Sequence, residues 1–118
     1  MKTVKQIVEE LSIKYELTCH DDIILERVIN SCSEDISINK FCACFRKDFM
    51  NISTKELAHK NNISVYSLYR FEEGLNKNYQ YIFFYLNVLE PWQRHLFIDL
   101  LYEIRKEFDY DRSRSLNY

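Results

Sequence analysis

Two short helices joined by a tight turn are predicted by residues 53–74, which read STKELAHKNNISVYSLYRFEEG. Ser53 is a suitable N-cap for the first helix, and Glu56 follows three residues later, as in a capping box. Ser64 is placed to cap the second helix, and Gly74 marks its end, because glycine tolerates the left-handed conformation that follows many helices. These residues predict where each of the two helices begins and ends.

The residue types at the turn and on the inner faces agree with this interpretation. Asn62 suits the turn, since asparagine tolerates the left-handed conformation that a tight connection requires. Ala58 is small enough for the two helices to cross closely. Ile63, Leu68 and Phe71 are spaced to fasten the second helix to a core. The residues left on its outer face are Val65, Tyr66, Ser67, Tyr69 and Arg70.

The segment 38–89 resembles the Cro and lambda-repressor-like helix-turn-helix family, often called the XRE type. The residues that carry this resemblance are Phe45-Arg46, Ser53 to Ala58, Ile63-Ser64 and Leu68 to Gly74. The resemblance implies an all-α fold, namely a lambda-repressor-like helix-turn-helix bundle with extra N-terminal and C-terminal helices. It also implies that Glu72 is a structural residue that holds the motif together.

In this family the second helix of the motif reads base edges in the major groove of DNA. Carried onto this sequence, the resemblance gives as candidate DNA-binding residues Ser53, Thr54, Lys55, Ser64, Val65, Tyr66, Ser67, Tyr69, Arg70, Lys77 and Asn78. The Arg70 guanidinium can fork onto guanine or bind a phosphate. The sequence departs from the family pattern at three positions, because Thr54 stands where Gln is frequent, Tyr69 where a small Ser is usual, and Asn62 where the turn has Gly.

The distribution of charge supports a binding surface in the middle of the chain. The formal net charge of the 118 residues is −2. Residues 1–35 carry four basic and eight acidic side chains, whereas residues 36–77 carry seven basic and four acidic ones. A binding face needs only local positive potential, so an acidic whole with a basic middle is compatible with nucleic-acid binding.

Helices are also expected on both sides of this motif. Apolar residues at helical spacing predict a helix over residues 3–16, a second opened by Asp21 or Asp22, and a third capped by Ser37. Two more are expected over about 78–89, with Ile82, Phe83, Leu86 and Leu89 inward, and over about 91–109. We divide the chain into an N-terminal helical extension (1–35), a helix-turn-helix module (36–89) and a C-terminal amphipathic helix with its tail (90–118).

The last predicted helix has an apolar face wider than one core contact requires. Either the N-terminal helix or a second subunit covers the excess. We expect a homodimer, since two such motifs about one turn of DNA apart would read a two-fold symmetric site. The candidate dimerisation residues are Trp92, Leu96, Phe97, Leu100, Leu101, Ile104 and Phe108.

Metal and catalytic sites are not expected. Cys19, Cys32, Cys42 and Cys44 lack the C-x-x-C spacing of zinc sites, and buried reduced thiols explain them better. The three histidines are scattered, and none belongs to a recognisable catalytic arrangement. No apolar run reaches the roughly 20 residues of a membrane span or resembles a secretory signal. We therefore expect a cytoplasmic protein that is not an enzyme and has no cofactor or membrane partner.

The predicted function is sequence-specific binding of double-stranded DNA by a small transcriptional regulator, in the first place a repressor, with the helix at about 65–73 in the major groove. The alternative is that the same scaffold binds a protein. Small regulators and inhibitors of defence systems in mobile genetic elements use such modules in both ways, and the composition fits an AT-rich mobile element.

Overall fold

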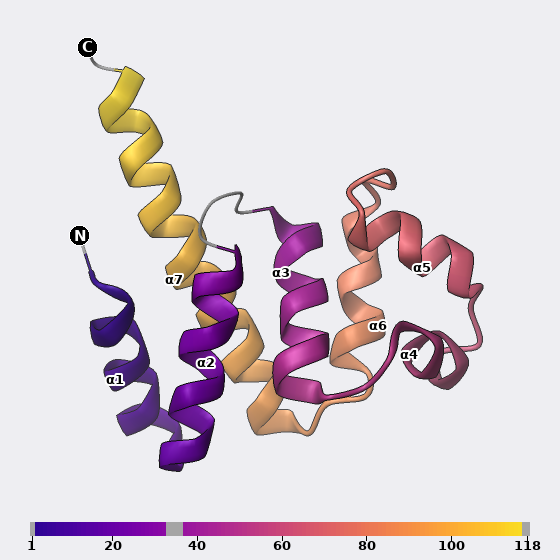
Figure 1. Cartoon of the computed structure of the whole chain (residues 1–118), viewed down its shortest axis with the longest axis horizontal. Coiled ribbons are helices and arrows are strands. Elements are labelled where there is room, and N and C mark those ends of the chain that lie inside the picture. The colour runs from indigo at the N-terminus through magenta and orange to yellow at the C-terminus, as the bar shows by residue number, and fades with distance from the viewer. Residues whose placement is uncertain (1, 33–36, 117–118) are drawn as a thin grey trace.

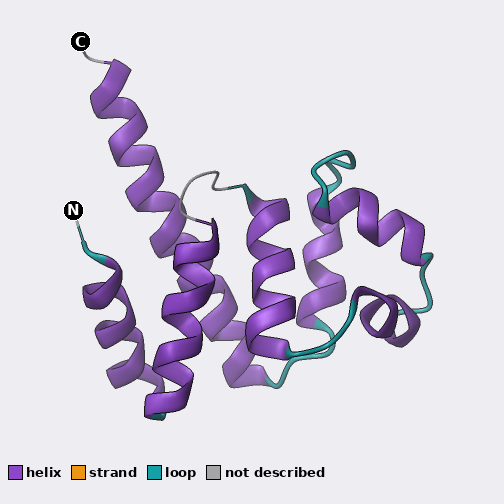
Figure 2. Cartoon of the chain, viewed as in Figure 1, coloured by secondary structure: helices purple, strands orange, loops and turns teal. Residues whose placement is uncertain are grey.

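The computed structural model describes residues 2–32 and 37–116, with side chains described up to residue 106. Every element in these ranges is helical, so the all-α prediction is confirmed (Figures 1 and 2). The α-helices are α1 (Val4–Tyr15), α2 (Cys19–Cys32), α3 (Ile38–Cys44), α4 (Thr54–Lys60), α5 (Val65–Glu72), α6 (Ile82–Leu86) and α7 (Pro91–Leu116). A π-helical segment, η1 (Phe45–Met50), continues α3, and a 3₁₀ turn, η2 (Tyr79–Tyr81), precedes α6.

The α4–α5 pair lies at one end of the molecule, and α1 lies at the other (Figure 1). Helix α1 packs on α2 and α7, α2 packs on α3, and α3 contacts α5. One apolar core runs through all three sequence segments and includes Leu25 from α2, Phe41 from α3 and Phe97 from α7. The boundary that we predicted between residues 35 and 36 lies outside the described residues.

Several predicted helix starts agree with the structure, and one does not. Ser37 caps α3 by accepting a hydrogen bond from the Lys40 amide, as expected. Helix α2, in contrast, begins at Cys19, so Asp21 and Asp22, either of which we predicted as its N-cap, both lie inside the helix. Thr18 and Asp21 exchange hydrogen bonds between their side chains and backbone amides, at 3.1 and 3.2 Å. Asp21 therefore works from the third position of the helix, with Thr18 at the cap.

The helix expected over 78–89 is shorter and faces differently. Only Ile82–Leu86 is α-helical, preceded by the 3₁₀ turn. Phe83, which we predicted to face inward, is 61% exposed, whereas Tyr85 is fully buried. The cause is the buried carboxylate of Glu72, which accepts a hydrogen bond from the Tyr85 hydroxyl and so gives a polar aromatic side chain a place in the core.

Four predicted dimerisation residues belong to the core of the single chain: Leu96, Phe97, Leu100 and Ile104. Helix α1 covers this face of α7 with Ile7, Val8 and Leu11, which are part of the same core. The assignment of these four residues to a surface for a second subunit is therefore wrong. Trp92 is 39% exposed and Leu101 is partly buried, while the side chain of Phe108 lies outside the described residues.

Ionic contacts fix α1 against α7. Asp99 accepts hydrogen bonds from the Lys14 ammonium, at 2.7 Å, and from the Tyr15 hydroxyl. The Lys2 ammonium donates to Glu103 at 3.2 Å. Burial alone would raise the pKa of Asp99, but the hydrogen bonds from Lys14 and Tyr15 outweigh it and lower the pKa below its usual value. None of the described helices is both long enough and apolar enough to cross a bilayer.

Candidate nucleic-acid interface

Helices α4 and α5 are joined by a turn that the backbone closes tightly. Asn62 has the left-handed conformation that we predicted for it, with φ of 54°. The Ile63 amide donates to the Ala58 carbonyl at 3.0 Å, and the Asn62 amide donates to the His59 carbonyl at 3.1 Å. Ala58 is fully buried, in agreement with the prediction that it must be small. The two helices consequently pack on each other.

Both helices have the N-caps that the sequence predicts. The Ser53 hydroxyl accepts a hydrogen bond from the Glu56 amide at 3.0 Å, and the Ser64 hydroxyl accepts one from the Ser67 amide at 3.4 Å. The reciprocal bond, which the Ser53 amide would donate to the Glu56 carboxylate, is not formed, so only half of the expected capping box is present. The carboxylate of Glu56 is thereby left at the surface.

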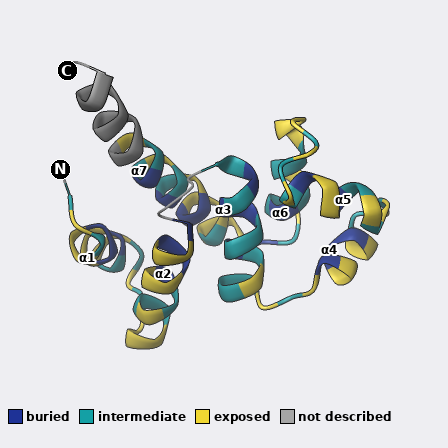
Figure 3. Ribbon diagram, turned by 45° about the horizontal axis from the view of Figure 1, so that its top comes forward, coloured by how far each residue is buried: buried dark blue, intermediate teal, exposed yellow. Residues whose placement is uncertain are grey.

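Helix α5 has a buried face and an exposed one (Figure 3). Leu68 and Phe71 are fully buried, whereas Tyr66 is 68% exposed and Tyr69 is 53% exposed. Arg70 is exposed as well. Of the other candidate residues on this helix and its cap, Ser64 is exposed, while Val65 and Ser67 are half-buried.

Two side chains of the exposed face, Arg70 and Tyr66, are in contact with each other. The Arg70 guanidinium lies over the Tyr66 ring, 5.7 Å from its centroid, and its Nη1 lies 3.5 Å from the Tyr66 hydroxyl. Residues four apart on a helix face are neighbours, which brings the two side chains into contact. A cation over an aromatic face is attracted by about 0.5–1 kcal/mol at an exposed site. The pair therefore offers a partly ordered donor group above an apolar ring.

A buried carboxylate braces the α4–α5 pair from behind. Glu72, the last residue of α5, accepts hydrogen bonds from Arg46 Nε at 2.8 Å and Nη2 at 3.0 Å. The Tyr85 hydroxyl donates to the same carboxylate at 2.7 Å. The exposed fractions of the Arg46 and Glu72 side chains are only 12% and 7%. Arg46 Nη1 also donates to the Ile52 carbonyl at 2.7 Å, which ties in the segment before α4.

Thr54 belongs to this brace and not to the outer surface. Its side chain is buried, and its hydroxyl lies 3.4 Å from Glu72 Oε1. The Thr54 side chain therefore faces the interior, which leaves its backbone amide, at the first position of α4, as the candidate phosphate contact. A carboxylate buried within the motif attracts every nearby donor, because an unsatisfied charge in the interior is costly.

The protonation states of the brace follow from its surroundings. Burial alone would lower the pKa of Arg46, but hydrogen bonds to Glu72 raise it overall. Burial, followed by the Glu72 carboxylate, raises the pKa of Tyr85 far above its ordinary value. The Tyr85 hydroxyl therefore stays protonated and donates.

A buried amide that the sequence analysis missed anchors the far end of α5. Asn39 is 1% exposed, and its Nδ2 donates to the Phe71 carbonyl at 2.7 Å and to the Asn76 carbonyl at 3.0 Å. The signal was available, because Asn39 stands three residues before Cys42 and so shares the inward face of its helix. A polar side chain on an apolar face requires such partners.

The loop after α5 displays the remaining candidates. Gly74 has φ of 80°, as expected where a helix ends, and the Leu75 amide donates to the Arg70 carbonyl at 2.9 Å. Lys77 and Asn78 are exposed. The Asn78 side chain accepts a hydrogen bond from the Gln80 amide at 3.2 Å, so it also caps the following turn. Lys77 lines a groove of about 440 Å³ together with Ser37, Lys40, Glu72, Glu73 and Gly74.

A second groove, of about 480 Å³, lies between the exposed side of α4 and the start of α5. Its lining residues are Ser53, Lys55, Glu56, His59, Ile63 and Val65. Lys55 is exposed there. Of the eleven candidate residues, eight are exposed on α4, α5 and the loop that follows, Val65 and Ser67 are half-buried, and Thr54 is buried.

The cysteines do not form a metal site within the described residues. No group of three or more His, Cys, Asp or Glu side chains in that part of the chain is close enough to hold an ion. Cys32 and Cys42 are buried, Cys44 is half-buried, and Cys19 is exposed, so the prediction of buried thiols is wrong for Cys19. It lies in the exposed first turn of α2, which the sequence analysis did not place in a helix.

Comparison with known proteins gave no match to any family model, to any curated protein or to any solved structure.

Proposed function

We propose that this protein is a sequence-specific double-stranded DNA-binding regulator, in the first place a repressor, and that the α4–α5 pair is a helix-turn-helix of the Cro and lambda-repressor type. The observation that carries the proposal is the outer face of α5, where Tyr66, Tyr69 and Arg70 are exposed on a helix whose opposite face is fully buried. An α-helix is about 10–12 Å across, and the major groove is about 12 Å wide.

The chemistry of this face suits base edges. Arg70 carries the two parallel donors that bind the O6 and N7 acceptors of guanine. Tyr66, which lies under the guanidinium, adds an apolar ring that can contact a thymine methyl group. Phosphates on either side of the groove would meet Lys55, at the start of α4, and Lys77, in the loop after α5.

The electrostatics of the pair support the same proposal. Glu72 is neutralised internally by Arg46, so it does not oppose a polyanion. The cationic side chains that remain exposed on the pair and its following loop are Lys55, Lys60, Arg70 and Lys77, against the anionic Glu56 and Glu73. Occupation of a promoter by such a module represses transcription by excluding polymerase.

Selection of bound sequences from random duplexes tests the proposal directly. An enriched motif containing guanine is expected, with retention that falls steeply as salt rises. On that motif Arg70→Ala should weaken binding by about 5- to 150-fold, since one bidentate pair is worth about 1–3 kcal/mol. Arg27→Ala is the matched control, because Arg27 is exposed on α2, away from the α4–α5 pair.

A protein partner is the second candidate, favoured by the apolar character of the same end of the molecule. Leu75, Tyr79 and Phe83 are 64%, 45% and 61% exposed. Tyrosines are enriched in protein interfaces, and Tyr66 and Tyr69 would serve there too. A stoichiometric partner in a pull-down, combined with no salt-sensitive retention on duplex DNA, would replace the DNA proposal by this one.

A further inference from the structure

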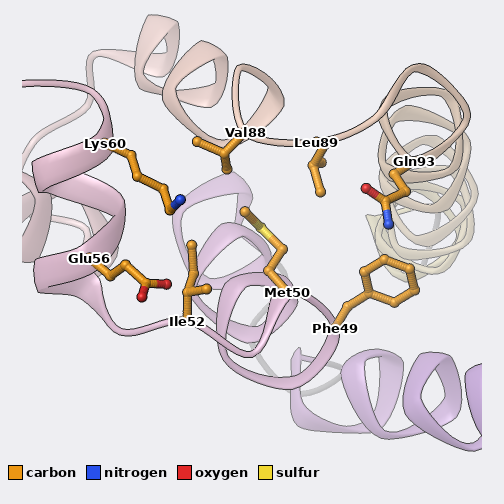
Figure 4. Close-up of a pocket in the computed structure, with 8 residues that line it drawn as sticks. All are labelled: Phe49, Met50, Ile52, Glu56, Lys60, Val88, Leu89 and Gln93. Carbon is orange, nitrogen blue, oxygen red and sulfur yellow. The ribbon is translucent and has the colours of Figure 1, made fainter.

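A separate pocket of about 260 Å³ lies between η1, α4 and the first turn of α7 (Figure 4). Its lining residues are Phe49, Met50, Ile52, Glu56, Lys60, Val88, Leu89 and Gln93. None of them is among the candidate DNA-binding residues. One wall is formed by the last residues of the π-helix, a rare element that is frequent at functional sites.

The floor of this pocket is apolar. Leu89 is buried, and Phe49, Met50, Ile52 and Val88 are half-buried. The side chain of Met50 points into the space between Val88 and Leu89 (Figure 4). Such a surface is suited to a small branched or unbranched aliphatic group, and methionine adapts to the shape of what it contacts.

The mouth of the pocket carries two opposite charges. Glu56 and Lys60 are exposed and stand four residues apart on α4, yet neither side chain forms an ion pair or hydrogen bond with another described residue. Figure 4 shows the Lys60 ammonium turned toward the pocket. Across from it, the Gln93 side chain accepts a hydrogen bond from the Glu90 amide through Oε1, which leaves its Nε2 as a donor without a described partner.

We infer that this pocket binds a free apolar α-amino acid. The ligand's carboxylate would be held by Lys60, its ammonium by the neighbouring Glu56, and its side chain by the apolar floor that extends toward Gln93. A simple carboxylate would meet the like charge of Glu56, and a simple amine would meet that of Lys60. Only a zwitterion pairs with both, because like charges repel and opposite charges attract.

The size of the pocket selects a small member of this class. A volume of about 260 Å³ lies just below the roughly 300–1,000 Å³ of sites for drug-sized ligands. A ligand as small as leucine suits it. Because so few atoms are buried and the charged groups are exposed, a dissociation constant on the order of 1 mM is expected.

Titration of the full chain with L-leucine, followed by amide chemical shifts in ¹⁵N-labelled protein, tests the inference. Shifts should concentrate at residues 49–52, 56–60 and 88–93. Two probes of nearly the same shape complete the panel, namely 4-methylpentanoate, which lacks the ammonium, and 3-methylbutylamine, which lacks the carboxylate. Each should bind about tenfold more weakly than leucine.

Matched variants separate recognition from non-specific binding. Lys60→Gln and Glu56→Gln should each weaken leucine binding about tenfold, whereas Lys5→Gln and Glu9→Gln, on exposed positions of α1, should leave it unchanged. Absence of localised shifts with leucine, or equal binding of 4-methylpentanoate, would overturn the inference. The titration contains no DNA, so a negative result with leucine would not count against the proposed DNA binding.

Discussion

The Tyr85 hydroxyl donates a 2.7 Å hydrogen bond to Glu72 Oε2, and this bond joins α6 to the last residue of α5. Arg46, from η1, donates to both oxygens of the same carboxylate. Three elements thus meet at one buried charge, close to the helix whose outer face we propose for DNA. The orientation of α5 depends on that charge as well as on apolar packing.

Removal of this charge should be costly. Glu72→Gln leaves the Arg46 guanidinium buried without its counter-ion, so a loss of about 3–5 kcal/mol in the free energy of unfolding is expected. Tyr85→Phe removes a single hydrogen bond to a charged group and should cost about 1.5–3 kcal/mol. Urea denaturation measures both. Glu73→Gln, at the exposed neighbouring position, is the control and should change stability by less than about 0.5 kcal/mol.

Replacing a large side chain of α7 by alanine tests whether that side chain belongs to the core of the folded chain. Phe97 is fully buried and packs edge-on against Phe41 and Phe45, with ring centroids 5.0 and 4.9 Å away. Phe97→Ala should therefore lower the free energy of unfolding by about 3–5 kcal/mol. Trp92→Ala, at a partly exposed aromatic on the same helix, should cost much less.

Light scattering on the same two variants tests whether Phe97 lies in the core of a single chain or in a contact between two chains. Phe97→Ala should have the same oligomeric state as the unmodified chain at temperatures where both are folded. If this variant kept its stability but changed its mass in solution, Phe97 would belong to an intersubunit contact after all.

The contact between α1 and α7 should weaken in acid. The folded-state pKa of Asp99 is lowered from 3.8, so its contribution is present above about pH 4 and is lost as the pH falls through the lower folded value. Asp99→Asn should destabilise the protein by about 1 kcal/mol at pH 7, a modest amount because Lys14 is largely exposed. The difference between variant and parent should shrink by pH 3. Glu26→Gln, at an exposed position of α2, should show no such pH dependence.

The four thiols should differ sharply in reactivity. Cys19 is exposed, whereas burial raises the pKa of Cys32 to about 12 and raises that of Cys42 well above the usual value. Since the thiolate is the reactive form, one rapidly alkylated thiol is expected in the native protein at pH 8. Cys19→Ser should abolish that rapid phase. In concentrated guanidinium chloride all four cysteines of the parent should react, and rapid native labelling of Cys42 would contradict the buried position.

Much of the local structure could be predicted because it depends on neighbours in the chain. The caps at Ser37, Ser53 and Ser64 need only a hydroxyl a few residues before an amide. The left-handed turn at Asn62 likewise reflects a property of that residue type. Helical spacing predicted that Leu68 and Phe71 are buried and that Tyr66, Tyr69 and Arg70 are exposed, but it also placed Val65 outside, where the structure packs it against the core.

Other features depended on partners distant in the sequence, and these predictions failed. Nothing near Thr54 in the sequence reveals that its hydroxyl lies against the Glu72 carboxylate, 18 residues later. Phe83 was expected to face inward but is exposed, because Tyr85 takes the buried position beside the Glu72 carboxylate. The wide apolar face of α7 predicted a partner, but its own α1 supplies one.

The chain's sequence by itself determined an all-helical protein, the caps and turn of the α4–α5 pair, and the outward position of Tyr66, Tyr69 and Arg70 on α5. Only the tertiary structure decided which side chains donate to the Glu72 carboxylate, what covers α7, and that η1, α4 and α7 enclose a pocket between them. Hydrogen bonds along a helix and its periodicity are set by residues within a few positions. Burial depends instead on which segments meet in space, and a single buried charge can reorder the side chains around it.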